Sequence, residues 1–526
     1  MIENFSFILA LLAAIVFVIM LADKMRVAYP ILLVISGLAI SFIPDIPSVR
    51  IKPEMLFVLF LPPLLYEAAW AISWKELWRW RRIIFSFAFV VVFFTAVCVA
   101  LFANFIIPGF SLALGFLLGG IVSPPDAVST SAILKFVKVP RRMASVLEGE
   151  SLLNDASSLI VFRFALVAVA TGQFIWQEAL LSFGWMIAGG LGVGLAIGFV
   201  FMQLHRRLPT NANMDIVFTF ITPYLIYIVA EELHCSGVIA VVSGGLLLST
   251  RRYTIFSSDV RLKAVNVWES LCFLLNGCIF LLIGLELPEI TKGLAVEGVP
   301  LPTAISYGVI ISFLLIAIRL VASYMAVVVT WVAKHFITVA DARNPGYQAP
   351  LVVGWAGMRG VVSLAAALSI PINLADGTLF PHRNLILFIT FTVILVTLVV
   401  QGLTLPLLIR KVKLTDPDEV YSKDDIALML KKELAHQALA FLDRHFPEKR
   451  HSHAFFSQLA DHYQLMKDAE EVRILDPESR RIYAQLLQYQ RDWLLTKNRN
   501  KVFLDEALIR EEIRFIDLEE EMMYRK

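Results

Sequence analysis

The sequence predicts an all-α polytopic membrane protein that ends in a soluble helical segment. Three observations support this fold class: a mean hydropathy of +0.73, long apolar blocks between residues 5 and 410, and a sharp fall in apolar content beyond residue 414. A bilayer core about 30 Å thick requires about 20 apolar residues per helix, and most of the blocks reach that length. We therefore predict a transmembrane domain over residues 1–413 and a cytosolic helical regulatory tail over residues 414–526.

The apolar blocks divide into about thirteen spans, centred near residues 14, 36, 63, 94, 117 to 133, 158, 192, 223, 243, 278, 317, 360 and 397. The loops after odd-numbered spans carry 18 Lys and Arg residues, and the loops after even-numbered spans carry four. The positive-inside rule then predicts a multi-pass protein of the cell (inner) membrane, with its N-terminus outside and its C-terminus in the cytoplasm. The net charge of +2 forms no basic stripe outside the loops, so no nucleic-acid partner is expected.

Two of the predicted spans contain residues that interrupt a helix. In the fifth span, two prolines remove backbone donors at membrane depth, in the run Ser123-Pro-Pro-Asp126. In the twelfth, an arginine lies among glycines, in the run Gly354-Trp-Ala-Gly357-Met-Arg359-Gly360. The breaks fall in the fifth member of two six-helix sets of opposite orientation, which indicates inverted repeats and a transporter site near the bilayer midplane. Two ordinary kinks that face other helices are the alternative.

Broken helices expose partial charges at their ends, which nearby side chains of opposite charge stabilise. We expect Asp126 to face helix N-termini and Arg359 to face helix C-termini. A buried arginine also needs a carboxylate, and Glu150 in the sixth span is the predicted partner of Arg359. A purely structural ion pair is one interpretation of these two residues. Arg163 and Arg319 are expected to be structural, Arg319 in an internal pair.

The sixth span carries the ionisable group that we expect to be functional. Ser151, Asp155 and Ser158 share one helix face, and Asn154 lies on the neighbouring stripe. Ionisable residues inside a span are costly and indicate function, and oxygen ligands are those that a hard cation such as Na⁺ requires. Desolvation disfavours a charged carboxylate, so a proton and a cation would compete for the oxygens of Asp155. Asn154 cannot titrate, which leaves one acid at the centre.

Three motifs together resemble those of the electroneutral branch of the monovalent cation/proton antiporters, the sodium/proton exchanger family in its bacterial form. They are Gly149-Glu-Ser-Leu-Leu-Asn-Asp155, Ser123-Pro-Pro-Asp126 and Gly357-Met-Arg-Gly360. The resemblance implies that Asp155 carries the ion or proton, that Ser151 and the backbone near Ser123 add ligands for Na⁺, and that Asp126 compensates helix dipoles.

The same resemblance implies a stabilising pair of Glu150 with Arg359. It also implies a six-helix core that moves in an elevator-like step against a homodimer interface. Asn154, where electrogenic relatives have a second aspartate, implies one-for-one stoichiometry. The ion and proton site is thus expected to comprise Asp155, Asn154, Ser151, Ser123 and Asp126.

These features predict a secondary antiporter that exchanges Na⁺ for H⁺, with Li⁺ and K⁺ left open as substrates. It would be no enzyme and would need no cofactor besides the transported ions. A K⁺/H⁺ antiporter is the close alternative. A cation channel or a membrane sensor gated by the tail is a more distant one, because the sequence lacks a filter-like pore loop.

Overall fold

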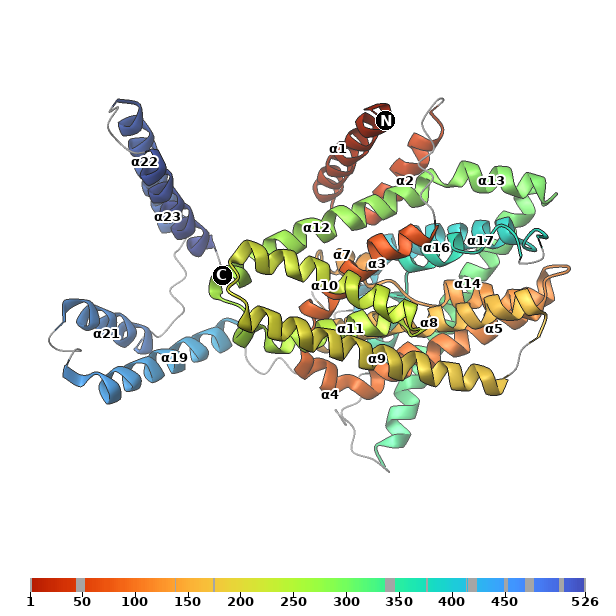
Figure 1. Cartoon of the computed structure of the whole chain (residues 1–526), viewed down its shortest axis with the longest axis horizontal. Coiled ribbons are helices and arrows are strands. Elements are labelled where there is room, and N and C mark those ends of the chain that lie inside the picture. The colour runs from red at the N-terminus through yellow and green to blue at the C-terminus, as the bar shows by residue number, and fades with distance from the viewer. Residues whose placement is uncertain are drawn as a thin grey trace. The chain divides into compact units, whose positions relative to one another are not determined.

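The computed structural model of the chain describes residues 2–43, 53–137, 139–173, 176–335, 346–374, 377–412, 414, 423–448, 453–468, 477–500 and 506–524 (Figure 1). The chain divides into two compact units, Met1–Asp416 and Pro417–Lys526. The described residues form helices and connecting turns, with one isolated antiparallel bridge between Asn373 and Leu379.

The helices of the first unit follow the predicted spans in order. The first nine are α1 (Ile2–Met25), α2 (Tyr29–Ser41), α3 (Pro53–Ala71), α4 (Trp74–Phe85), α5 (Val92–Ile106), α6 (Leu112–Val122), α7 (Ala127–Leu134), α8 (Arg141–Thr171) and α9 (Trp176–Arg207). The others are α10 (Ala212–Glu232), α11 (Gly237–Ile255), α12 (Ser258–Leu285), α13 (Leu287–Val296), α14 (Leu301–Ala333), α15 (Gln348–Trp355), α16 (Val361–Leu368), α17 (Arg383–Val396) and α18 (Gly402–Val412). Two π-helical segments, η1 (Ser86–Val91) and η2 (Thr397–Gln401), join α4 to α5 and α17 to α18.

Several of the 18 basic residues counted in the predicted loops lie in helices. The clearest case is the group of arginines between residues 79 and 82, in the predicted loop after the third span, which lies in α4. The helix forms there because the segment is amphipathic: Trp80 and Ile84 are buried, whereas the arginines are exposed. The fourth predicted span is therefore the second part of a longer helix that includes η1 and α5.

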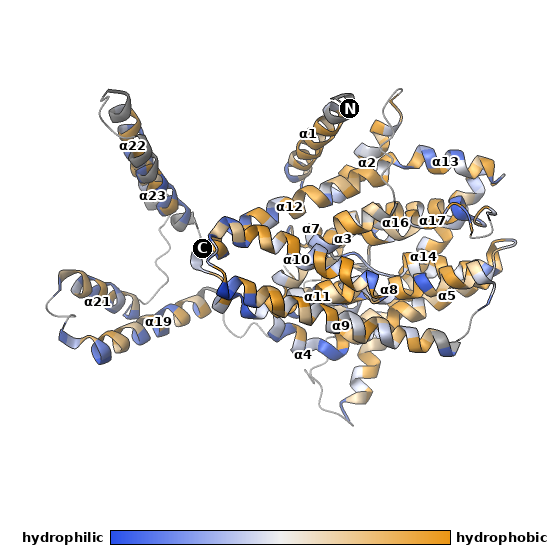
Figure 2. Ribbon diagram, viewed as in Figure 1, coloured by the Kyte–Doolittle hydropathy of each residue, from blue (hydrophilic) through white to orange (hydrophobic). Residues whose placement is uncertain are grey.

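The surface of the first unit is apolar, as a bilayer requires. Among the described residues, eight helices are long and apolar enough to cross a membrane, and α2, α3 and α6 are shorter apolar helices. Phe17, Phe105 and Leu181 are 69%, 86% and 76% exposed, and Figure 2 shows hydrophobic residues along most of these helices. In water so many exposed apolar side chains would drive aggregation, whereas lipid tails are their natural surroundings. The unit is a multi-pass membrane domain.

Small residues bring the membrane helices close together. Gly37 of α2 faces Gly284 of α12, and a Cβ added to Gly37 would lie 3.1 Å from the Cα of Gly284. Such close backbone approach replaces the hydrophobic driving force that is missing between helices in lipid. One large apolar cluster joins α6, α14, α16 and α17 around the broken helices, and a second joins α3, α10 and α11.

The second unit consists of helical pairs. Helix α19 (Lys423–His445) packs on α21 (Ala454–Lys467) through Leu439, Leu442 and Ala460. Helix α22 (Pro477–Asn500) pairs with α23 (Glu506–Tyr524), where Arg491 Nε donates to Asp517 at 2.8 Å. Figure 2 shows hydrophilic and hydrophobic residues mixed along α19 and α21, as expected for amphipathic helices.

Candidate functional site

The two interrupted segments of the chain cross each other. Helix α6 ends at Val122 and α7 begins at Ala127, while α15 ends at Trp355 and α16 begins at Val361. At the crossing, the N–H of Asp126 donates to the carbonyl oxygen of Met358 at 2.7 Å. The hydroxyl of Thr130 donates to the carbonyl oxygen of Ala356 at 3.0 Å. Each break thus satisfies backbone groups of the other, which non-helical backbone at membrane depth requires.

A charged side chain caps one half-helix on each side of the crossing. The carboxylate of Asp126 accepts hydrogen bonds from the N–H groups of Ser129 (2.9 Å) and Val128 (3.3 Å), and from the hydroxyl of Ser129. This is an N-cap of α7. Arg359 Nε donates to the carbonyl oxygen of Val122, the last residue of α6, at 2.8 Å. Each charge therefore lies at the helix end that its sign stabilises.

The predicted ion pair of Glu150 with Arg359 is wrong. Glu150 is instead held by Arg319 of α14, which donates two hydrogen bonds to its two carboxylate oxygens, the second at 2.6 Å. The guanidinium of Arg359 is occupied by carbonyl oxygens of Val122, Ser123 and Gly357. Arg319 and Glu150 have 3% and 1% of their side chains exposed, so both charges of this pair are removed from solvent.

Helix α8 passes beside the crossing and presents Asn154 and Asp155 to it. The Nδ2 group of Asn154 donates to the carbonyl oxygen of Pro125, between α6 and α7, at 2.9 Å. Its Oδ1 atom is buried and has no hydrogen-bond partner in the described part of the chain, and the same is true of Ser123 Oγ. Buried polar atoms are nearly always paired, so two unsatisfied oxygens in one small region indicate a site for a ligand.

Asp155 is a buried carboxylate that has no hydrogen-bond partner among the residues that the structure describes. Its residue is 9% exposed, and none of the described residues donates a hydrogen bond to its side chain. The nearby hydroxyl of Ser158 donates to the main-chain oxygen of Asp155 at 3.0 Å. An isolated ionised carboxylate is costly to bury. Burial therefore disfavours the ionised form of the Asp155 side chain.

Two cavities adjoin α8, one on each side of Asp155 along the helix axis. A small one of about 20 Å³, close to the volume of one water, is lined by Asp126 and Ser151 among others. A larger one of about 220 Å³ is lined by Leu159, Ile160 and Arg163 of α8 and by α10 and α11. Ser151 precedes Asp155 and Arg163 follows it, so the two cavities adjoin the parts of α8 before and after Asp155, which itself lines neither cavity.

The larger cavity contains an ion pair that the sequence did not reveal. Arg163 donates a hydrogen bond to Glu231 of α10, and the second carboxylate oxygen of Glu231 accepts from the N–H of Gly237 at 3.1 Å. Arg163 was expected to be structural, and the pair agrees with that role. The two residues are 68 positions apart, so no local pattern could have joined them.

The structure thus brings most of the sequence-predicted residues to one region, which comprises Ser123, Asp126, Glu150, Asn154, Asp155 and Arg359 around the crossing, with Ser151 in the wall of the small cavity. Besides Asp126 and Glu150, which have partners, this region offers the carboxylate of Asp155 and the neutral oxygens of Asn154 and Ser123. Such a set suits a hard monovalent cation, because one negative charge balances one positive charge.

The sequence is similar to that of known sodium/proton exchangers, and the fold is similar to that of a solved antiporter structure. The model of the family described as "Sodium/hydrogen exchanger, transmembrane" matches residues 8–411. A "Sodium, potassium, lithium and rubidium/H(+) antiporter" of Bacillus pumilus is 35% identical over 390 residues, which cover 73% of this chain but only 58% of that protein. An uncharacterized Na(+)/H(+) exchanger of Mycobacterium tuberculosis (strain H37Rv) is 33% identical over 526 residues, 98% of this chain and 95% of that one.

A solved structure shares the fold. The sodium proton antiporter MjNhaP1 from Methanocaldococcus jannaschii, determined at pH 8, aligns with a TM-score of 0.63 at 18% identity. The alignment covers 78% of this chain and 99% of that chain. The helices of the second unit lie beyond the family match, which ends at residue 411.

Proposed function

This chain belongs to the sodium/hydrogen exchanger family, and from that premise we propose that it is a secondary antiporter that exchanges Na⁺ for H⁺ across the membrane. The proposal rests on the surroundings of Asp155. Its carboxylate is buried, receives no hydrogen bond from the described residues and lies in α8 between the stretches that line two cavities. A transport site needs such a group, which must be free to bind cargo and reachable from both sides in turn.

Exchange follows from competition at this carboxylate. Either a proton or a Na⁺ ion neutralises Asp155, whereas the empty, ionised form leaves an unpaired charge away from water. The moving part of the protein would therefore cross easily when loaded with either ion and poorly when empty. Asn154 Oδ1 and Ser123 Oγ are unsatisfied oxygens that would join the Na⁺ shell, and Ser151 lies one turn away toward the small cavity.

Two of the other acids near the crossing, Asp126 and Glu150, have fixed partners. Asp126 accepts three hydrogen bonds as the cap of α7, and Glu150 is held by Arg319. We propose that both hold the broken helices in place and that Asp155 alone binds and releases the transported ions. One exchangeable acid then gives electroneutral, one-for-one exchange.

We further propose the orientation and assembly that the sequence predicts. The basic residues at odd-numbered loops favour an external N-terminus and a cytoplasmic C-terminus. A homodimer, against which the core with the broken helices would move, is proposed from family membership. Li⁺ and K⁺ are proposed as further substrates, since the Bacillus relative is named for both ions.

The test is ion-driven proton movement in proteoliposomes. The full-length protein is reconstituted with an acidic interior, and dequenching of a pH-sensitive dye is followed after Na⁺, Li⁺ or K⁺ is added outside. The Asp155→Asn variant should lose exchange with every cation. The matched control is Asp259→Asn, the same chemical change at an exposed residue that pairs with Lys263 on the surface of α12.

Persistent exchange in Asp155→Asn would remove the proposed carrier. Cation flux into vesicles without any proton movement would favour a channel instead. Net current during exchange, measured on a solid-supported membrane, would contradict the argument for a single exchangeable acid.

A further inference from the structure

The cavity of about 220 Å³ beside α8 lies between two groups of helices. In the first, α8 lies against α6, and a Cβ added to Gly120 would lie 2.9 Å from the backbone nitrogen of Phe162. In the second, α9 lies against α11, and a Cβ added to Gly190 would lie 2.7 Å from the carbonyl oxygen of Ser236. Such close backbone approach holds each group together. We call them the α6–α8 group and the α9–α11 group.

An ion pair spans this cavity and joins the two groups. Arg163 of α8 donates a hydrogen bond to Glu231 of α10, and both residues line the cavity. Elsewhere α8 meets α3 and α11 through apolar side chains such as Leu152 and Ala156. Apolar contacts have no fixed direction and are exchanged for others when helices shift, whereas a charged hydrogen bond requires one geometry. A shift of α8 relative to α10 must therefore break the pair.

The pair is built so that it can separate. One carboxylate oxygen of Glu231 accepts from the N–H of Gly237, the first residue of α11, at 3.1 Å. A carboxylate is stabilised at a helix N-terminus, so Glu231 keeps a favourable partner when Arg163 leaves. The Arg163 side chain is 40% exposed, and water can solvate it. The pair of Glu150 with Arg319 differs, because at most 3% of either side chain is exposed.

The pair lies between Asp155 and one end of α8. Arg163 follows Asp155 by about two turns, or about 12 Å along the helix axis. The cavity extends inward as far as Leu159, about one turn from Asp155. Helix α10 begins after the basic residues 206 and 207 and ends beside Glu231, so the positive-inside rule predicts that the pair faces outward. An ion that arrives from outside would meet the pair before it meets Asp155.

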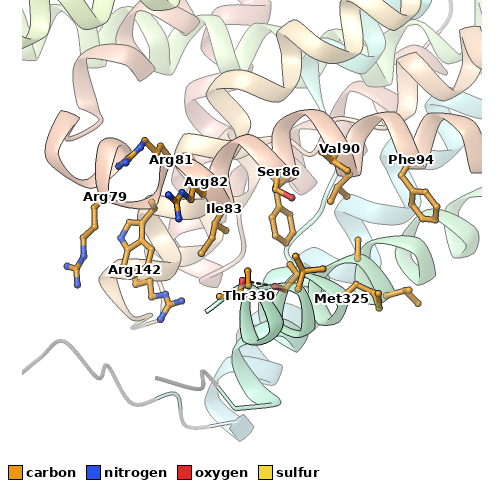
Figure 3. A pocket seen from close by; sticks show the side chains of 18 residues that line it. Arg79, Arg81, Arg82, Ile83, Ser86, Val90, Phe94, Arg142, Met325 and Thr330 are labelled. Carbon is orange, nitrogen blue, oxygen red and sulfur yellow. Dashed lines mark hydrogen bonds between the residues drawn. The ribbon is translucent and has the colours of Figure 1, made fainter. Parts of the chain in front are cut away.

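Another cavity of the membrane unit lacks such a pair. It is a groove of about 630 Å³ between the helix formed by α4, η1 and α5 and helix α14 (Figure 3). None of the 18 residues that line it is acidic, so no ion pair between its lining residues crosses it. An ion pair across a cavity is therefore a particular feature of the space between the two groups.

We propose that Arg163 and Glu231 form an outer gate, which closes when they pair and opens once in each exchange cycle. The inference rests on the proposed antiport. The closed gate separates the Leu159 end of the cavity from the outer surface. When it opens, Glu231 stays at the N-terminus of α11, and Arg163 moves with α8. Because both side chains are partly exposed, losing the pair should favour the open form about fivefold, equivalent to about 1 kcal/mol.

The first test measures how fast a water-soluble reagent enters the cavity. Ile160 lines the cavity and is 1% exposed, and Ile160→Cys is made in the full-length chain after its four native cysteines are replaced by alanine. A charged maleimide is added to the outer side in vesicles. Labelling should be about fivefold faster in Arg163→Gln and in Glu231→Gln, and no faster in the double variant, because each change removes the same pair.

The control for labelling is Gln173→Cys, an exposed position beyond the end of α8, which should react at one rate in every variant. Unchanged labelling of Ile160→Cys in the Arg163→Gln and Glu231→Gln variants would overturn the gate. Labelling that rises further when the two changes are combined would also overturn it, since the residues would then act independently.

The second test locks the gate. Arg163→Cys and Glu231→Cys are joined by a bifunctional methanethiosulfonate reagent, and exchange is followed with the dye assay in proteoliposomes. Cross-linking should slow exchange at least tenfold, and dithiothreitol should restore it. The matched control is Arg206→Cys with Thr254→Cys, which joins α9 to α11 within one group, where Arg206 Nη2 donates to the Thr254 hydroxyl at 3.3 Å. Exchange should continue in that cross-linked control.

The gate and the antiport fail in different ways. If the unmodified protein moves no protons in response to any cation, the antiport is wrong, and the labelling test still decides the gate. If the unmodified protein exchanges ions and the cross-linked Arg163/Glu231 variant does so equally fast, the gate is wrong and the antiport stands. Loss of exchange in the cross-linked control as well would overturn the assignment of the gate to this pair.

Discussion

The buried pair of Glu150 with Arg319 gives the sharpest prediction about stability. Replacing Arg319 with Gln leaves Glu150 without a partner, because Arg359 is occupied by the carbonyl oxygens at the end of α6. The pair has two hydrogen bonds and at most 3% exposure, so solvent cannot compensate the loss. Breaking a pair of this kind costs about 3–5 kcal/mol in the free energy of unfolding.

Double-mutant cycles measure the coupling energy between Glu150 and each of the two arginines, and so identify its ion-pair partner. Removing both charges with Glu150→Gln and Arg319→Gln should cost less than the sum of the two single changes, with a coupling energy of about 2–3 kcal/mol. The matched cycle of Glu150→Gln with Arg359→Gln should give a coupling below about 1 kcal/mol, because those side chains have different partners.

The assay is reversible unfolding in mixed detergent micelles, followed by tryptophan fluorescence. Monodisperse elution of every variant before denaturation is the control for folding. A coupling energy larger for Arg359 than for Arg319 would refute the assignment of the pair and restore the interpretation made from sequence.

Three further predictions concern the crossing itself. Gly360→Ala should abolish exchange, because the added Cβ would lie 2.6 Å from Cγ of Asp126. Gly192→Ala is the control and should exchange normally, because a Cβ added there meets no neighbouring atom within 4 Å. The dye assay in proteoliposomes compares the two variants, and equal activity would contradict the geometry. Asp126→Asn should lower the free energy of unfolding by less than about 1 kcal/mol, because Asn also caps helices well. Asp126→Ala should lower it by about 1–2 kcal/mol. Equal losses in denaturant titrations would show that capping is not the role of Asp126. Asn154→Asp adds a second acid beside Asp155 and should make exchange depend on membrane voltage. The exchange rate is measured with and without a potential imposed by valinomycin. Voltage-independent exchange in this variant would contradict the explanation of electroneutrality by a single exchangeable acid.

The sequence predicted the order of the membrane helices because each apolar block carries its own length signal. It also located both breaks, since prolines at 124 and 125 and glycines around Arg359 disfavour a continuous helix wherever the chain is packed. The ends of the broken helices carry Asp126 and Arg359 because a helix end attracts opposite charge, a local rule that needs no knowledge of the fold.

The partner of Glu150 could not be found in the same way. Two buried arginines were available, and Arg319 lies 169 residues from Glu150. The choice depends on how α14 packs against α8, and on the carbonyl oxygens that already occupy Arg359.

The hydrogen bond from Asp126 N–H to the carbonyl oxygen of Met358 links two peptide planes that are far apart in the chain. If either break straightened into a continuous helix, a backbone polar group of the other break would lose its hydrogen-bond partner. In the proposed exchange the two interrupted segments would therefore move together, with α8 linked to them by the hydrogen bond from Asn154 to the carbonyl oxygen of Pro125. A substitution that disrupts one of the two breaks is therefore expected to disrupt the other as well.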